Sequence, residues 1–299
     1  MRGTIDNMAL TDAHPAPPDA AQAGHRITLR DLRQWAAQGT KFAMLTCYDA
    51  TTARWLWRAG VKAMLVGDTA AQILLGYDST LPAKMPFMLE LTAAVRRGAP
   101  DALIMADMPF GSYQCSNDAA VANASAFLAE GNADLVKMEV DDSFAPLVER
   151  MSHSGIPIVA HIGSRPQTVR STGCFVSTGR TQRVADILVA TAETMIRAGA
   201  VAILIEAVPD AVSRRITEQS IQPGSGRPVP VIGCGAGPSC HGQVLVLHDL
   251  LGLTDWQPPF AEPISHMGEQ LIQAAAAWIQ QVESGQYLRN GGPYQMRHP

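Results

Sequence analysis

Five ionisable side chains stand at the ends of five separate apolar runs in this chain. Asp68 follows the run at residues 63–66, and the runs at 103–107, 135–139, 159–161 and 203–206 end in Asp107, Glu139, His161 and Glu206. An apolar strand that ends on an ionisable residue delivers it to the strand's C-terminal end, where α/β enzymes carry out their chemistry. A single aspartate at such a position is more often a helix cap or a turn former. Five such ends in one chain favour a shared catalytic site.

Asp68, Asp107 and Glu139 offer hard oxygen ligands at the ends of consecutive expected strands. Few histidines and no paired cysteines lie nearby, so this ligand set favours an octahedral Mg²⁺ that keeps several waters over zinc or copper. A magnesium ion with open positions suits an α-keto acid, which can chelate it through carboxylate and carbonyl oxygens and form a stabilised enolate. We therefore predict a Mg²⁺ site at these three carboxylates.

The remaining candidates complete this chemistry. Lys137 and Glu139 share one face of their strand by the two-residue period, and we predict that Lys137 binds the substrate carboxylate. The alternative for this pair is a structural ion pair. Glu206, across the barrel, is the predicted base that removes the proton next to the carbonyl. His161 suits a catalytic role and a supporting role equally well.

The spacing of the apolar runs predicts the fold that holds these residues. Strands are expected at residues 42–47, 63–66, 103–107, 135–139, 158–161, 202–206, 229–233 and 244–247, and helices at 27–38, 49–59, 86–97, 144–153, 184–198, 211–219 and 267–284. A further alanine-rich helix is expected from Asn117 or Asp118, as its cap, to about residue 130. Strands that alternate with helices predict a parallel sheet, and about eight repeats predict closure into a (β/α)₈ TIM barrel. The extra N-terminal helix at 27–38, with Thr28 as its N-cap, is expected to close the bottom of the barrel.

Three connecting segments and two tryptophans are further candidates for a structural or functional role. The polar loop 76–82 at the expected mouth suits a substrate lid or a subunit contact. The glycine-rich stretch 233–238 is either an anion-binding loop or a tight turn, and its spacing excludes dinucleotide and P-loop motifs. Residues 222–230 are expected to form a flexible insertion. Trp55 and Trp57 are expected to serve packing or a subunit contact rather than a ligand.

Composition excludes some classes of protein. Of the 299 residues, 47% are hydrophobic and 17% are charged, with a net charge of −4, so a large core is expected without a basic surface for nucleic acid. Five cysteines without a C-x-x-C pair are typical of reduced thiols in a cytoplasmic protein. No run approaches the roughly 18 apolar residues of a membrane helix. We expect a disordered leader at 1–25, one catalytic barrel at 26–286 and a flexible tail at 287–299.

Eight sequence stretches resemble the ketopantoate hydroxymethyltransferase family, also called the 3-methyl-2-oxobutanoate hydroxymethyltransferases. They are M-L-T-C-Y-D at 44–49, V-G-D-T at 66–69, G-Y-D-S-T-L-P at 76–82, A-D-M-P-F-G-S-Y-Q at 106–114, V-K-M-E at 136–139, H-I-G at 161–163, I-E-A-V-P at 205–209 and G-A-G-P-S-C-H-G-Q-V-L-V at 235–246. The match runs in order from about residue 27 to residue 286.

This resemblance implies a Mg²⁺-dependent barrel that transfers a hydroxymethyl group from 5,10-methylenetetrahydrofolate to 3-methyl-2-oxobutanoate (α-ketoisovalerate). The product is 2-dehydropantoate (ketopantoate), a precursor of pantothenate and coenzyme A. The family's metal carboxylates fall on Asp68, Asp107 and Glu139, and its catalytic base falls on Glu206. Its substrate contacts fall on Asp68, Thr69, Asp107 and Lys137. The resemblance also implies a homo-oligomer, typically a decamer.

The chain departs from the family pattern at several positions. Thr69 stands where the family usually has serine, so the hydroxyl is kept and a methyl group is added. His241, which is expected near the mouth, replaces an acid. Leu91 replaces a histidine. Residues 172–179 differ from the usual glycine-rich segment, and the insertion at 222–230 is longer. These departures bear on the identity of the keto acid and on the folate contacts.

Three alternative functions follow from the same residues. A specialised paralogue would act on a related α-keto acid. A phosphoenolpyruvate mutase or isocitrate lyase type of carbon–carbon lyase would share the barrel, but its K-[KR]-C-G-H loop is absent from the chain. A catalytically silent binding barrel would have no chemical need of Asp68, Asp107, Lys137, Glu139 and Glu206.

Overall fold

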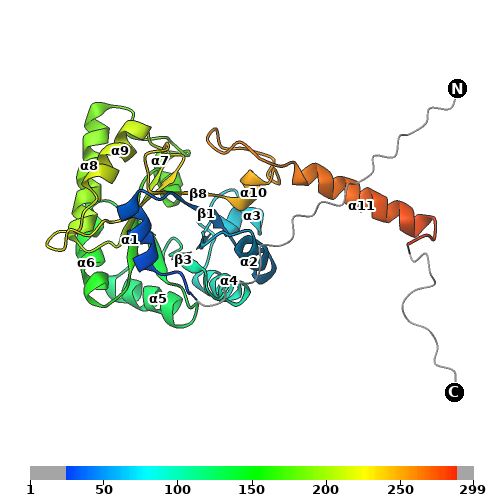
Figure 1. Cartoon of the computed structure of the whole chain (residues 1–299), viewed down its shortest axis with the longest axis horizontal. Coiled ribbons are helices and arrows are strands. Elements are labelled where there is room, and N and C mark those ends of the chain that lie inside the picture. The colour runs from blue at the N-terminus through cyan, green and yellow to red at the C-terminus, as the bar shows by residue number, and fades with distance from the viewer. Residues whose placement is uncertain (1–24, 288–299) are drawn as a thin grey trace, which may run out of the picture.

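A computed structural model describes residues 25–287, and these form a closed barrel of parallel strands (Figure 1). Each strand pairs with the next along the chain, and the last pairs with the first. The strands are β1 (Phe42–Thr46), β2 (Ala63–Val66), β3 (Leu103–Asp107), β4 (Leu135–Glu139), β5 (Ile158–Gly163), β6 (Ala202–Glu206), β7 (Val231–Cys234) and β8 (Gly242–Leu245). The predicted (β/α)₈ fold is therefore confirmed.

Helices follow most of the strands. They are α1 (Leu29–Gln38), α2 (Ala50–Arg58), α3 (Ala70–Ile73), α4 (Met85–Gly98), α5 (Asn117–Ala129), α6 (Ala145–His153), α7 (Val169–Thr172), α8 (Gln182–Arg197), α9 (Asp210–Gln219), α10 (Leu247–Leu250) and α11 (Met267–Glu283), with 3₁₀ turns at Asp142–Phe144 and Pro166–Thr168. The four-residue helices α3, α7 and α10 escaped prediction. The predicted cap of α5 at Asn117 or Asp118 is wrong, because Ser116 has extended backbone angles and its Oγ accepts from Ala119 N at 3.1 Å.

The N-terminal helix closes the bottom of the barrel, as predicted. Thr28 and Asp31 form a capping box at its start, and Gly39 ends it with a φ of 68°. Leu32 is fully buried in the barrel interior with Leu103 and Leu135, the first residues of β3 and β4. Because parallel strands start at the same end of the barrel, these contacts place α1 at the N-terminal end.

Every residue of β2, β3 and β4 is buried. Side chains inside the barrel pack on one face of these strands, and helices pack on the other face. Burial on both faces explains why the sequences of the strands are continuously apolar. The larger core lies between the strands and the surrounding helices, with Met88 of α4, Phe127 of α5 and Met151 of α6 fully buried. This packing holds the C-terminal ends of neighbouring strands rigidly side by side.

Two predicted features lie at the opposite end of the barrel from the carboxylates. Strand β8 begins at Gly242 rather than Val244, so His241 precedes it at the N-terminal end, and the expected place near the mouth is wrong. His241 Nδ1 accepts from Val231 N at 3.0 Å at the start of β7. The insertion 222–230 precedes β7 at this same end and folds into a turn, with Gln222 N donating to Arg227 O at 2.8 Å.

The predicted leader and tail lie outside the described residues, except for residues 25 and 287. Within residues 25–287, none of the helices is long and apolar enough to span a membrane.

Candidate active site

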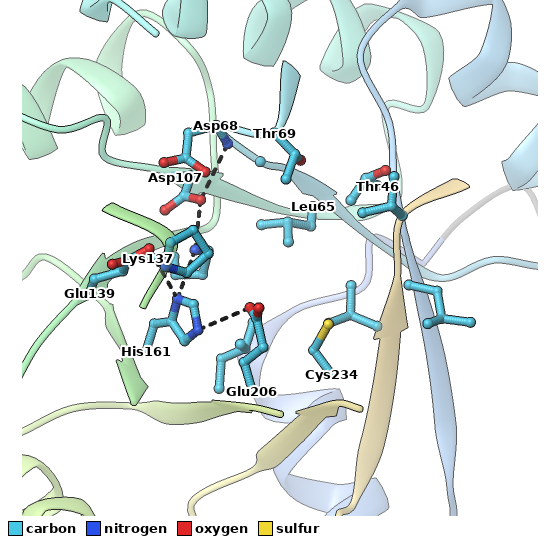
Figure 2. Close-up of a pocket in the computed structure, with 16 residues that line it drawn as sticks. Thr46, Leu65, Asp68, Thr69, Asp107, Lys137, Glu139, His161, Glu206 and Cys234 are labelled. Atoms are coloured by element: carbon cyan, nitrogen blue, oxygen red, sulfur yellow. Dashed lines mark hydrogen bonds and ion pairs between the residues drawn. The ribbon is translucent and has the colours of Figure 1, made fainter. Parts of the chain in front are cut away.

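One pocket at the C-terminal ends of the strands gathers the predicted site residues (Figure 2). Its lining includes Asp68, Thr69, Asp107, Lys137, Glu139, His161 and Glu206. The strand register explains this gathering, since Asp107 lies opposite Lys137 on the next strand and Glu139 lies opposite His161. Residues that are far apart in the sequence thus become neighbours through parallel pairing alone.

A continuous line of contacts crosses the pocket (Figure 2). Lys137 Nζ lies 2.6 Å from Asp107 Oδ2 and 3.3 Å from His161 Nδ1. On the other side of its ring, His161 Nε2 lies 3.3 Å from Glu206 Oε2. An ammonium group donates to Nδ1, so in the neutral ring Nε2 carries the proton. Nε2 has no well-aligned hydrogen-bond partner among the described residues, although Glu206 lies next to it. Lys137 therefore pairs with Asp107. Among the described residues it forms no ion pair with Glu139, so the alternative of a structural pair between these two side chains is not observed.

Burial changes the pKa values of the residues in and beside this line of contacts. Burial, opposed by Lys137 and reinforced by Asp68, raises the pKa of Asp107 to about 8. Burial also raises the pKa of Glu139 well above its usual range, and Asp68 adds to the effect. For Lys137, burial lowers the pKa, but the nearby carboxylates outweigh it and leave the pKa above its ordinary value. Burial and the charge of Lys137 lower the pKa of His161, which keeps the ring neutral at pH 7.

The acids outnumber the positive charges. Asp68, Asp107 and Glu139 surround one ammonium group, and Asp107 Oδ1 is buried without a hydrogen-bond partner among the described residues. A hard divalent cation would displace the protons that the raised pKa values leave on Asp107 and Glu139, and it would use the free oxygen. The three carboxylates nevertheless do not converge on one point. Among residues 25–287, no cluster of three His, Cys, Asp or Glu side chains is close enough to hold a metal ion.

Gln167, in the 3₁₀ turn after β5, stands between these carboxylates. Its Nε2 donates to Asp68 Oδ2 at 2.9 Å and to Met108 O at 2.9 Å. Its backbone N–H donates to Glu139 Oε2 at 3.0 Å, and Tyr113 OH donates to its Oε1 at 2.7 Å. Gln167 thereby ties Asp68 and Glu139 to the loops after β3 and β5.

Neither Gln167 nor Tyr113 was predicted as a site residue, although Tyr113 lies in the family-like stretch 106–114. The available signal was a glutamine directly after Pro166 at the mouth of the barrel, and an aromatic residue in the loop that follows Asp107. Both are buried polar side chains, which rarely occur without hydrogen-bond partners.

Glu206 is held by a close approach of two strand ends. Gly163, with a φ of 95°, leaves no room for a Cβ beside the Glu206 carbonyl, and Ser164 N donates to that carbonyl at 2.9 Å. The side chain of Glu206 is 21% exposed, against 2–5% for Asp107, Lys137 and His161, so it is the more accessible group. Apolar side chains complete the wall beside it, namely Leu65, Leu204 and Val244.

Thr69 lies at the N-terminal end of α3, directly after Asp68. Its Oγ1 lies 2.7 Å from Tyr48 OH, which comes from the segment after β1. The hydroxyl group that the family pattern keeps at this position is therefore held by a buried phenol.

The other predicted features contribute little to the pocket, and Cys234 is the residue of the stretch 233–238 that lines it. In 233–238, a Cβ at Gly235 would overlap the Phe260 ring and one at Gly237 would overlap Asp210, so packing explains these glycines and the tight turn is favoured. Leu91 is half-buried against the outer core. Segment 172–179 is joined to the residue after Glu206 by a hydrogen bond from Thr178 N to Ala207 O at 3.0 Å.

Loop 76–82 contains no helix or strand, and its role as a lid or subunit contact stays a prediction. Trp55 is 63% exposed, with Arg58 stacked 5.0 Å from its ring centre. Trp57 is partly buried against the core and lies under Lys62. Trp55 is therefore the better candidate for a subunit contact, and Trp57 is a packing residue.

Comparison with known proteins identifies relatives along almost the whole described chain. The model of the ketopantoate hydroxymethyltransferase family matches residues 26–289. The 3-methyl-2-oxobutanoate hydroxymethyltransferase of Geotalea daltonii is 40% identical over 268 residues, which cover 89% of this chain and 98% of that protein. The enzyme of the same name from Thermobifida fusca is 39% identical over 274 residues, covering 91% and 95%.

Solved structures share the barrel at much lower identity. Phosphoenolpyruvate phosphomutase from Streptomyces platensis subsp. rosaceus has a TM-score of 0.57 and 13% identity, covering 90% of this chain and 92% of that one. A 2,3-dimethylmalate lyase, a PEP mutase/isocitrate lyase superfamily member, has a TM-score of 0.56 and 14% identity, covering 89% and 93%. At such identities the likeness is one of fold.

Proposed function

The chain belongs to the ketopantoate hydroxymethyltransferase family, and we propose that it transfers a hydroxymethyl group from 5,10-methylenetetrahydrofolate to 3-methyl-2-oxobutanoate. The product is 2-dehydropantoate, for pantothenate and coenzyme A synthesis. The observation that carries the proposal is the line of contacts from Asp107 through Lys137 and His161 to Glu206, which sets a cation and a base on either side of His161 in one pocket.

The atoms of this reaction balance with water as the third reactant. The keto acid loses the proton on the carbon next to its carbonyl, and this carbon bonds to the methylene carbon of the folate. Both carbon–nitrogen bonds of that methylene group break. Water supplies the hydroxyl group, and the two folate nitrogens take up protons, which gives tetrahydrofolate.

The acidic side of the pocket suits a resident Mg²⁺. The residues that would hold it are Asp68, Asp107 and Glu139, and the buried free oxygen of Asp107 and the excess of carboxylates support this assignment. When bound there, the cation supplies Lewis acidity toward the carboxylate and carbonyl oxygens of a keto acid. Gln167 engages both Asp68 and Glu139 through hydrogen bonds, and it thereby links the positions of these two side chains.

The chain's own residues position the substrate. The ammonium group of Lys137, held between Asp107 and His161, provides a buried point charge for the carboxylate of the keto acid. The apolar wall of Leu65, Leu204 and Val244 suits the isopropyl group of 3-methyl-2-oxobutanoate. Both surfaces line the same pocket as Glu206, so a keto acid bound by them would place its C–H bond within the pocket of the base.

Glu206 acts as the general base of the proposed reaction. A neutral His161, with Nε2 at 3.3 Å from Glu206 Oε2, lies beside the carboxylate without neutralising it. The partial exposure of Glu206 leaves room for substrate on its open side. We also place the protein in the cytoplasm, since all five cysteines are free thiols.

Hydrogen exchange tests the catalytic proposal without folate. With Mg²⁺ and 3-methyl-2-oxobutanoate in heavy water, the wild-type protein should exchange the hydrogen next to the carbonyl, as followed by NMR. Glu206→Gln should exchange it at least about 10²-fold more slowly and still bind the keto acid. The exposed Glu218→Gln is the matched control and should behave as wild type.

Two results would refute the assignment. Normal exchange in Glu206→Gln would mean that another group is the base. If the wild type releases no labelled 2-dehydropantoate when 5,10-methylenetetrahydrofolate is added, but turns over another keto acid, the specialised-paralogue alternative is correct.

A further inference from the structure

The segment between β5 and the first turn of α8, residues 164–183, concentrates positive charge at the mouth of the barrel. We call it the rim segment. It contains four arginines and no aspartate or glutamate, in a chain whose net charge is −4. Arg165 pairs with Asp141 at 2.8 Å. Arg170, Arg180 and Arg183 are exposed, and none of them forms an ion pair within residues 25–287. Three arginines without a carboxylate partner attract an anion to this surface.

The rim segment also exposes apolar side chains. Phe175 is 48% exposed and Val176 is 50% exposed, and both stand in the sequence between two of the unpaired arginines. In the loop after β3, Phe110 is 49% exposed. The two loops adjoin each other, since Gln114 Nε2 donates to Gln167 Oε1 at 3.3 Å. An aromatic surface beside free guanidinium groups suits a flat ligand that carries negative charge.

Both ends of the rim segment are fastened to the catalytic pocket. Near its start, Pro166 lines the pocket. Near its end, Thr178 N donates to the carbonyl of Ala207, the residue after Glu206, at 3.0 Å. Residues 170–177, between these two points, are all exposed. The exposed part of the rim segment therefore lies at the mouth, beside the proposed base.

The proposed reaction needs a second substrate at this place. The keto acid is assigned to the buried side of the pocket, where Lys137 is only 5% exposed. The donor is larger, because it carries a pterin, an aminobenzoyl ring and a glutamate tail with free carboxylates. Its methylene carbon must come close to Glu206, the more accessible end of the line of contacts. The rest of the donor must then lie on the surface around the mouth.

We propose that the rim segment binds the reduced folate donor. Phe175 packs against the aromatic rings of the folate, and Arg170 and Arg180 bind the carboxylates of its glutamate tail. Each additional glutamate adds a carboxylate, so the site prefers polyglutamated folate to the monoglutamate. The inference rests on the proposed function, since it places the donor of that reaction. It also gives a role to the departure from the family pattern at 172–179, which contacts the donor rather than the keto acid.

Calorimetry on the full-length protein tests the arginines. The titrant is tetrahydrofolate, as the monoglutamate and the triglutamate, with saturating Mg²⁺ and 3-methyl-2-oxobutanoate; no one-carbon unit is present, so no turnover occurs. The wild type should bind the triglutamate more tightly. Replacing Arg170 and Arg180 together by Gln should weaken triglutamate binding about tenfold or more and remove the preference. The exposed Arg30→Gln, on α1 at the other end of the barrel, is the matched control and should change neither.

The same titrations test the aromatic contact. Phe175→Ala should weaken the binding of both folates by the same factor, about five- to tenfold, because the rings are common to both. Ile187→Ala, at a residue of α8 that is 50% exposed, is the matched control and should bind both folates as the wild type does. A loss confined to the triglutamate in Phe175→Ala would contradict the assignment of this residue to the rings.

The outcomes separate this inference from the proposed function. Folate binding by the wild type that neither the arginine variant nor Phe175→Ala weakens would overturn the placement of the donor and leave the proposed function standing. A wild type that binds neither form of tetrahydrofolate would overturn both. Light scattering identifies the competing role of the surface as a subunit contact. A reduced mass in Phe175→Ala, together with unchanged folate affinity, would assign the rim segment to that contact and refute the inference.

Discussion

The side-chain amide of Gln167 donates a 2.9 Å hydrogen bond to Asp68 Oδ2 across 99 positions of sequence. The same residue donates its backbone N–H to Glu139 Oε2 at 3.0 Å. One glutamine thus orients two of the three carboxylates that we assign to Mg²⁺, and it does so from the loop after β5. Residues that orient ligands in this way often affect metal affinity nearly as strongly as the ligands themselves.

Gln167→Met should weaken Mg²⁺ binding about 10- to 100-fold, because the thioether fills a similar volume and cannot donate to Asp68. Titration calorimetry measures this affinity. Tyr113→Phe, which removes one contact to Gln167 and leaves both carboxylates engaged, serves as the comparison and should have a smaller effect. Unchanged or tighter Mg²⁺ binding in Gln167→Met would mean that the amide competes with the metal rather than preparing its ligands.

The contrast between Asp68 and Gln167 shows what could be predicted from the sequence. Asp68, Asp107, Glu139 and Glu206 each follow an apolar run, and parallel pairing brings such ends together whatever the intervening sequence. Their place could therefore be predicted locally. Gln167 has no such pattern, since its role depends on the exact packing of two loops that the chain brings together only after folding.

Strand β8 and helix α11 show two further limits. The apolar run at 244–247 continues into α10, so hydrophobicity alone does not mark where the strand starts, and the prediction for His241 failed with it. The period of α11 could be predicted, but an amphipathic pattern does not indicate whether the helix packs on its own barrel. In the structure none of its side chains is buried by the described residues.

The pKa values of Asp107 and Glu139 make Mg²⁺ binding depend on pH. Both pKa values are raised, so near pH 7 the metal-free site retains protons that the ion must displace. The apparent affinity should therefore increase as the pH rises from about 6.5 to about 8.5, by up to about tenfold per pH unit for each proton released. Calorimetry in buffers of different ionisation enthalpy counts these protons.

The control for this dependence is Asp107→Asn, which removes one of the titrating carboxylates. It should weaken Mg²⁺ binding and flatten the pH profile while the fold stays intact. An affinity that does not vary with pH in the wild type would contradict the raised pKa values, and an unchanged affinity in Asp107→Asn would contradict the metal assignment.

Lys137→Met should weaken keto-acid binding by about tenfold or more, equivalent to about 1.4 kcal/mol, because the buried point charge for the substrate carboxylate is lost. The variant also leaves Asp107 without its partner at 2.6 Å, so a lower melting temperature is expected. Lys84→Met, at an exposed lysine, is the control. Keto-acid affinity equal to that of the wild type would reduce Lys137 to a structural partner of Asp107.

Gly163→Ala tests whether the position of Glu206 depends on the close approach of β5 and β6. The added methyl group would overlap the Glu206 carbonyl, and the φ of 95° is strained for alanine, so β6 must shift at its end. A displacement of about 1 Å at a catalytic group can cost about 10²-fold in rate, so exchange of the keto-acid hydrogen should slow by about that factor. Magnesium affinity should change little, because Asp68, Asp107 and Glu139 lie on other strands or the loops that follow them.

Gly155→Ala is the control for this variant. Gly155 has a comparable φ of 80°, and nothing lies within 4 Å of the added methyl group, so the variant carries the backbone strain without the overlap. Equal losses of exchange in the two variants would show that strain alone is responsible and that Gly163 does not position the base.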